Sequence, residues 1–174
     1  MYENVIKFYS KSKDENIRKL SNFHIEKFEL ENIEFKSGEH CFHYFKFCTI
    51  AKLCKDEKRS NELIDHSIKI LNVDMPHEVK KLSNKSNFKL TNEELKIWSS
   101  CSNQFQYEIC LEKIKQNKNV KEILLKTDKK YLLHQDNRAN INTIWGGRIK
   151  NDVLIGKNNL GEIWMTLRAK YINI

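Results

Sequence analysis

The sequence has 174 residues and lacks any apolar run of about 18 residues, the length that a membrane-spanning helix needs. Its first thirty residues carry too many charges for a secretion signal. Five cysteines, at positions 41, 48, 54, 101 and 110, form no CxxC pair, and their odd number leaves one over, which is unusual for a disulfide framework. We therefore expect free thiols, a reducing cytoplasmic location and no membrane contact.

Arginine is also scarce. The net charge is +8 and the pI is about 9.2, but nearly all the cations are lysines. Such an excess favours a polyanionic partner, either nucleic acid or a phosphorylated ligand. Lysine, however, is a point charge and not a bidentate phosphate clamp, and A/T-rich coding would also enrich Lys, Asn and Ile. Nucleic acid is thus a candidate partner that composition alone does not decide.

There is no internal repeat, no low-complexity linker and only one proline, so nothing in the sequence marks a domain boundary. A chain of this length with 40% apolar residues and nine phenylalanines can fill one sizeable core. We expect a single domain over residues 1–174, and its oligomeric state is open.

The N-terminal part favours β-structure. Residues 5–10 predict a short strand, and residues 11–19 a charged loop. Residues 25–30 and 33–36, separated by Glu31-Asn32, predict a hairpin. Between them, the word Leu20-Ser-Asn-Phe23 holds Ser21 and Asn22, which either face a ligand or make hydrogen bonds within a turn.

Helices dominate the rest of the sequence. Ser37 and Ser60 are candidate N-caps, Pro76 suits a first helical turn, and Thr91 with Glu94 forms a capping box. Apolar spacing predicts helices after each of these residues, with Trp98 in the core. Further segments complete the pattern: a helix over 120–126, a β-prone run over 131–133 and a last helix over 160–171. The predicted class is α+β, a helix-rich domain with a small N-terminal antiparallel β element.

The segment Glu39–Phe47 opens the first long helix. Phe42, Phe45, Ile50 and Leu53 recur at helical spacing, which predicts an amphipathic helix. Seven residues return a helix to nearly the same azimuth, so Glu39 and Lys46 share one stripe, about 10 Å apart along the axis. This pair either forms a charged rim around a core helix or brings an acid and an amine to a reactive site.

Glycine is rare except in one region. Four of the five glycines lie between positions 134 and 161, in Trp145-Gly-Gly147 and Gly156-Lys-Asn-Asn-Leu-Gly161. Concentrated glycine indicates unusual backbone geometry or close approach to a ligand. Trp145 either presents its face to a base, as stacking aromatics do, or covers the core.

Metal chemistry is not predicted. His40, Cys41 and His43 crowd one helical turn, but no second Cys/His pair has the spacing of a metal site. We expect no metal and no cofactor.

A series of short motifs resembles the NADAR (YbiA-like) family in order and spacing over almost the whole chain. In order, these are Phe8-Tyr9-Ser10, Leu20-Ser21-Asn22-Phe23, Glu39-His40-x-Phe42-xxx-Lys46-Phe47, Gln116-Asn117, Leu124-Leu125-x-Thr127, Trp145-Gly146, Gly156-x-Asn158-x-Leu160-Gly161 and Trp164-Met165-x-Leu167-Arg168.

The resemblance implies an α+β N-glycosidase that cleaves the bond between a base and a ribose. The ribose would carry a phosphate or ADP, as in riboflavin-pathway intermediates or ADP-ribosylated guanine in DNA. It also implies that Lys46 forms an imine with C1′, an attack that needs an unprotonated amine, and that Glu39 stabilises the cationic transition state or moves a proton. The substrate-binding residues implied are Ser21, Asn22, Phe23, His40, Trp145, Gly146 and Asn158.

One motif departs from the family pattern. Where the family has Asn-Asp three residues before Trp-Gly, this chain has Ile141-Asn142, so an amide replaces an acid at a position that we count as catalytic. Asp136 is the nearest carboxylate that could substitute for it. The alternative to an enzyme is therefore a module that binds ADP-ribose or a nucleotide with little turnover.

Overall fold

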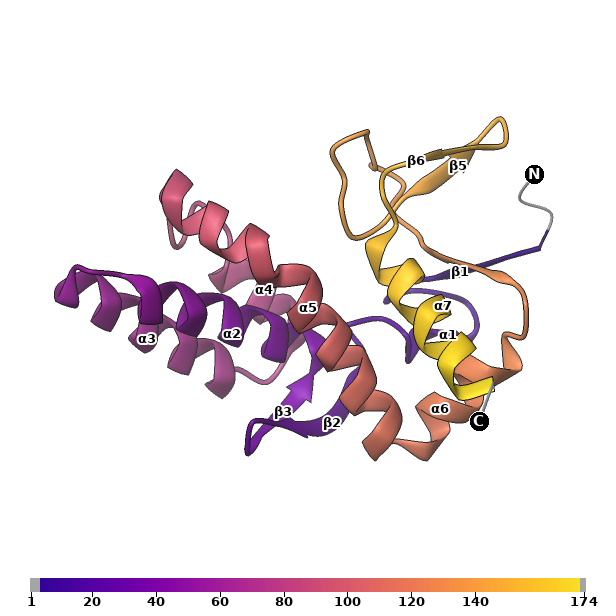
Figure 1. Ribbon diagram of the computed structural model, residues 1–174, viewed down its shortest axis with the longest axis horizontal. Coiled ribbons are helices and arrows are strands. Elements are labelled where there is room, and N and C mark those ends of the chain that lie inside the picture. Colours follow the sequence, from indigo (N-terminus) through magenta and orange to yellow (C-terminus); the bar gives the residue numbers. More distant parts are fainter. Residues whose placement is uncertain (1–3, 173–174) are drawn as a thin grey trace. The chain divides into compact units, whose positions relative to one another are not determined.

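Helices make up most of the regular structure in the computed structural model, which describes residues 4–172 (Figure 1). The helices are α1 (Glu15–Arg18), α2 (Gly38–Leu53), α3 (Glu57–Asn72), α4 (Pro76–Leu82), α5 (Asn92–Gln116), α6 (Lys118–Lys126) and α7 (Asn159–Ile172). The strands are β1 (Val5–Phe8), β2 (Ile25–Leu30), β3 (Ile33–Ser37), β4 (Tyr131–His134), β5 (Arg148–Lys150) and β6 (Val153–Ile155). The α+β, helix-rich class is confirmed.

The chain folds into two compact units. Unit 1 comprises residues 1–24 and 113–174, and unit 2 comprises residues 25–112. Each unit has its own buried apolar side chains. The single domain over residues 1–174 stays a prediction.

Unit 2 begins with the predicted hairpin. Strands β2 and β3 are antiparallel, with Phe28 opposite Phe35. Glu31 and Asn32 have φ angles of 53° and 61°, the left-handed pair of a tight two-residue turn. Strand β3 ends at Ser37, which has extended backbone and caps α2 by accepting a hydrogen bond from the His40 N–H. The hairpin therefore fixes where α2 begins.

Helix α2 lies beside α3 (Figure 1) and also contacts β3 and α4. Its buried residues surround the helix axis and do not form one stripe: Gly38, Glu39, His40, Cys41, Phe42, Phe45, Phe47, Ile50 and Ala51. The prediction of an amphipathic helix was wrong because neighbouring elements cover α2 on several sides.

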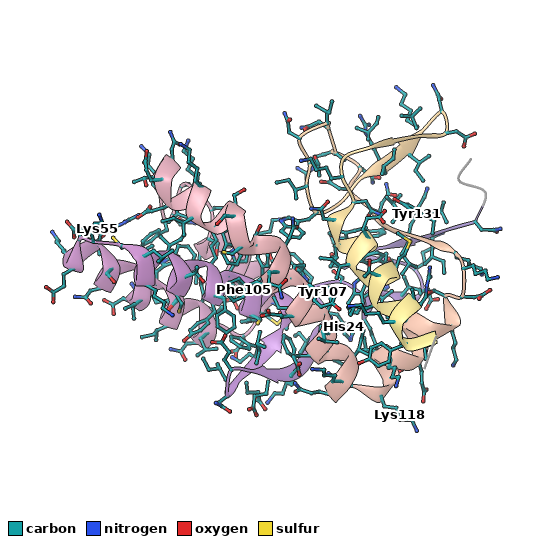
Figure 2. All side chains as sticks on the ribbon, in the orientation of Figure 1. His24, Lys55, Phe105, Tyr107, Lys118 and Tyr131 are labelled. Atoms are coloured by element: carbon teal, nitrogen blue, oxygen red, sulfur yellow. The ribbon has the colours of Figure 1, made fainter. Side chains whose placement is uncertain are left out.

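Aromatic rings fill the space between α2 and α5 in unit 2. Phe105, labelled in Figure 2, stacks on Phe45 with ring centroids 5.2 Å apart. Trp98 meets Phe42 edge to face at 4.9 Å and is 7% exposed. The prediction that Trp98 belongs to the core is confirmed.

In unit 1, β1 pairs with β4 in parallel, with Phe8 opposite His134. Helix α7 packs on β4, and its buried Trp164 donates a hydrogen bond from Nε1 to the Leu20 carbonyl at 2.8 Å. The sequence predicted both strands but not their pairing, because 122 residues separate the end of β1 from the start of β4 along the chain.

Three local predictions need correction. The charged loop over residues 11–19 contains α1, because the Asp14 side chain caps it by accepting from the Asn16 N–H. The irregular segment after His134 contains the β5–β6 hairpin, which turns at Asn151 and Asp152, both with positive φ. Helix α3 is capped by Asp56 and not by Ser60, whose hydroxyl instead donates to the Ala51 carbonyl at 3.0 Å.

The inward face of α3 is set by its packing. Leu63, Ser67 and Ile70 face inward, whereas Ile64 and Ile68 are exposed. No helix within residues 4–172 is both long and apolar enough to cross a membrane.

Two buried histidines of unit 2 generate a prediction about acid stability. Burial lowers the pKa of His40 and of His66 below the ordinary value of 6.5. The folded state therefore binds fewer protons than the unfolded state as the pH falls below 6.5, so stability is complete above that pH and declines toward the lower folded-state pKa. Urea unfolding should give a smaller free energy at about pH 5.5 than at about pH 7.5. His66→Gln should lessen this difference, and an equal or larger free energy at the lower pH would contradict the prediction.

Candidate active site

The first turn of α2 holds a buried histidine with both ring nitrogens engaged. His40 Nδ1 lies 2.8 Å from Ser37 Oγ, and Nε2 lies 3.1 Å from the Val73 carbonyl. A carbonyl only accepts, so Nε2 carries the proton and Nδ1 accepts from the serine hydroxyl. Burial lowers the His40 pKa, which keeps the ring neutral. This geometry gives His40 a structural role in joining α2 to the end of α3, and a contact between His40 and a ligand stays a prediction.

Glu39 lies next to His40 and pairs with a different histidine. Its Oε1 is 3.2 Å from His43 Nε2, and both side chains are largely buried. His43 Nδ1 is buried and has no hydrogen-bond partner among residues 4–172. The carboxylate is therefore held in place by the His43 ring.

Lys46 follows His43 by one helical turn. It is half-buried, and desolvation lowers the pKa of its ammonium group below the ordinary value of 10.5. Within residues 25–112, its Nζ makes neither a hydrogen bond nor an ion pair, and it lies 5.5 Å from the centre of the Phe47 ring. An amine without a counter-charge loses its proton more easily, which is what a nucleophilic lysine requires.

A cavity of about 420 Å³ opens beside Lys46 within unit 2. The other lining residues come from the α4–α5 loop and the first turn of α5, and they include Ser83, Lys85, Phe88 and Lys89. The sequence analysis did not predict that these residues line a cavity beside Lys46. Residues 83–92 form a polar stretch between two helices, and they contain no recognisable motif that would have pointed to a site.

The remaining predicted residues belong to unit 1. Ser21 is buried, its Oγ accepts from the Phe23 N–H at 3.3 Å, and its carbonyl accepts from the fully buried Lys113 Nζ at 3.3 Å. These bonds fix the backbone of the Ser21-Asn22-Phe23 turn. Asn22 and Phe23 are partly exposed, so their contact with a ligand stays a prediction.

The Trp145 loop is held against the end of β4. His134 Nδ1 lies 3.2 Å from the Trp145 carbonyl, and the Gly147 N–H donates to the His134 carbonyl at 2.9 Å. A side chain at Gly146 would place its Cβ 2.7 Å from that same carbonyl, so only glycine allows the loop to pass so close. Trp145 itself is half-buried, and its contact with a ligand stays a prediction.

Asn158 forms hydrogen bonds with the backbone of β4. It is fully buried, its Oδ1 accepts from the His134 N–H at 2.8 Å, and its Nδ2 donates to the Leu132 carbonyl at 2.8 Å. Nδ2 also donates to the hydroxyl of Tyr131, labelled in Figure 2, at 3.1 Å. The structure gives Asn158 a role in joining β4 to the start of α7, and its predicted contact with a ribose or phosphate stays a prediction.

Asn142 lies in an exposed turn before Trp145. Its backbone N–H donates to Asn140 Oδ1 at 2.9 Å. Asp136 lies beside the Trp145-Gly146 motif: its Cβ is 3.3 Å from the position that a Cβ on Gly146 would take. Asp136 is thus a carboxylate beside the Trp-Gly motif, whereas the catalytic role of Asn142 stays a prediction.

Comparison with known proteins identifies the family. The NADAR domain model matches residues 7–171, and the chain belongs to this family. The NMR structure of the Escherichia coli protein YbiA has a similar fold, with a TM-score of 0.69 at 24% sequence identity over 99% of this chain and 88% of that chain. No curated protein sequence matches significantly. Family membership supports an N-glycosidase role, and the predicted resemblance is confirmed.

The environment of Asn158 predicts a loss of stability when its amide is removed. Asn158→Ala removes the buried hydrogen bonds that Asn158 makes with the His134 N–H and the Leu132 carbonyl, which should lower the free energy of unfolding by about 2 kcal/mol. The matched control is Asn142→Ala, whose exposed side chain should matter by less than about 0.5 kcal/mol. Chemical denaturation of both variants makes the comparison. Unchanged stability of Asn158→Ala together with lost ligand affinity would instead show a ligand contact.

Proposed function

We propose that this chain is an N-glycosidase that cleaves the bond between a base and a phosphorylated ribose through an imine on Lys46. The observation that carries the proposal is the Lys46 amine, half-buried without a counter-charge at the wall of a cavity, one helical turn from His43 and two turns from the Glu39 that His43 contacts. An isolated salt-bridge rim would instead pair Lys46 with a carboxylate.

The chemistry begins with departure of the base, which keeps the electron pair of the C1′–N bond. The lone pair of the neutral Lys46 amine then forms a bond to the electron-poor C1′ carbon. The new secondary amine releases a proton, and the Glu39–His43 pair accepts it. The negative charge of Glu39 also favours the positive charge that develops on the ribose.

Release of the sugar regenerates the enzyme. The C1′–O4′ bond breaks, O4′ takes up a proton and an imine forms between C1′ and Lys46. Water adds to the imine carbon, the C1′–Nζ bond breaks, and the ribose leaves as an aldehyde that closes to its ring. One proton of this water returns to Nζ, and the other neutralises the departed base anion. The net reaction is substrate plus water giving free base plus ribose, so the amine and the proton-carrying pair return to their starting state.

The substrates to test are ADP-ribosylated guanine in DNA and phosphoribosylated riboflavin-pathway intermediates. Both present a base on C1′ and phosphate beyond the 5′ carbon, which accords with a lysine-rich cavity beside Lys46. The alternative of a binding module stands on one observation, the amide at Asn142 in place of an acid. It requires ADP-ribose binding without release of base.

The imine chemistry predicts that Lys46 is essential. Lys46→Arg keeps the positive charge but removes an amine that can lose its proton, so base release should fall by at least about 10³-fold. Borohydride added during turnover should attach the sugar to Lys46, as located by peptide mass spectrometry, and no adduct should form in the variant. Lys52→Arg, on the exposed end of the same helix, is the matched control.

Two outcomes would contradict this account in different ways. Full activity of Lys46→Arg would exclude the imine while leaving the glycosidase. Binding of ADP-ribose by the wild-type protein with no release of base from either substrate would favour the binding module.

A further inference from the structure

The cavity beside Lys46 is rich in hydrogen-bond donors. Three of its lining residues are lysines, at positions 46, 85 and 89, against one carboxylate, on Glu93. Within residues 25–112, the ammonium groups of Lys85 and Lys89 form no ion pair, and both side chains are exposed. Their charges are therefore available to a ligand that enters the cavity.

Uncharged donors lie in the same wall. Ser83 Oγ is buried and has no hydrogen-bond partner within residues 4–172. Asn92 and Glu93 begin α5, and neither of their backbone N–H groups has an acceptor in the described part of the chain. The next two N–H groups, by contrast, are satisfied by Thr91. The free amides at the start of this long helix add to the donors and to the positive potential.

The loop that carries these donors is held by Arg59 of α3. Its Nε and Nη2 donate to the two carboxylate oxygens of Glu94 at 2.7 and 2.9 Å, and Nη2 also donates to the Lys89 carbonyl at 2.9 Å. The guanidinium lies 4.8 Å from the centre of the Phe88 ring. Because Arg59 neutralises Glu94, that carboxylate does not cancel the positive charge of the cavity.

The donors fit one kind of ligand group. A phosphate offers only acceptor oxygens and carries negative charge, so ammonium groups, a hydroxyl and free helix amides all complement it. On a ribose, C1′ and the 5′ carbon lie on opposite sides of the ring oxygen. A sugar whose C1′ meets Lys46 therefore extends its 5′ substituent away from that amine and along the cavity.

From this arrangement, and resting on the imine chemistry proposed above, we infer that Ser83, Lys85 and Lys89 bind the 5′-phosphate of the substrate's ribose. Phe88 forms an apolar side of the same cavity, and the start of α5 donates its free amides to the phosphate. The subsite makes the protein selective for a phosphorylated sugar over a plain one, whichever base is attached.

Reductive trapping with two simple sugars tests the subsite. Ribose 5-phosphate and ribose are each incubated with the full chain and cyanoborohydride, and the adduct on Lys46 is quantified by peptide mass spectrometry. Ribose 5-phosphate should label Lys46 at least about tenfold faster at equal low concentration, as expected for one or more charge-assisted hydrogen bonds. The double variant Lys85→Ala/Lys89→Ala should reduce this preference to within about twofold of unity.

Two matched variants complete the design. Lys55→Ala/Lys58→Ala removes the same charge from exposed positions of unit 2 that do not line the cavity, and it should keep the preference. Ser83→Ala removes a buried hydroxyl that has no partner within residues 4–172, so it should leave the melting temperature unchanged or higher while lowering the preference.

A binding measurement separates the subsite from the imine. Titration calorimetry without reductant compares ribose 5-phosphate, ribose and a short single-stranded DNA on the wild-type protein and both double variants. If no adduct forms with either sugar, the imine is wrong. The subsite is then retained only if the wild type still prefers ribose 5-phosphate and Lys85→Ala/Lys89→Ala loses that preference.

Other results overturn the subsite itself. Equal labelling by both sugars would do so, and so would a preference that survives Lys85→Ala/Lys89→Ala. If that variant weakens DNA binding alone, the lysines contact a nucleic-acid backbone and not the phosphate of the reacting sugar.

Discussion

The burial of α2 is the constraint on which unit 2 depends. Neighbouring elements cover this helix on several sides, so each polar side chain near its start must find a partner or lose free energy. His40 is satisfied by Ser37 and Val73, and Glu39 by His43. Two groups have no such partner: His43 Nδ1 is buried without a hydrogen bond among residues 4–172, and desolvation lowers the pKa of the Lys46 amine with no anion within residues 25–112 to compensate. Side chains whose pKa values are shifted by burial are often found at functional sites.

The same reasoning identifies polar residues of unit 1 that have a structural role. Asn158 and Ser21 are both buried, and their side chains form hydrogen bonds with nearby backbone groups. Trp145 is half-buried in the loop that these bonds help to shape. Asn158, a motif residue of the family, thus helps to build this part of unit 1, and a ligand contact of Trp145 stays a prediction.

The features predictable from the sequence were those fixed by neighbouring residues. Glu31-Asn32 specified the hairpin turn, Ser37 the start of α2 and Thr91 with Glu94 the start of α5, because each acts over at most a few residues. The start of α3 was misassigned because Asp56 and Ser60 are both acceptable caps, and the Ala51 carbonyl engages the serine. The parallel β1–β4 pair and the lysine-lined cavity were missed because both depend on residues far apart in the chain.

The proposed chemistry requires that the Lys46 amine lose its proton more easily than an ordinary lysine does. Titration of that amine measures this property directly. Proteins with ¹³C-labelled lysine, compared with Lys46→Arg to assign the resonance, allow the Lys46 pKa to be followed by NMR. We expect a pKa below the ordinary value of 10.5, since burial disfavours the charged form and no carboxylate of unit 2 restores it. A pKa at or above 10.5 would show that the amine is solvated or paired, and it would contradict the role of Lys46 as a neutral nucleophile.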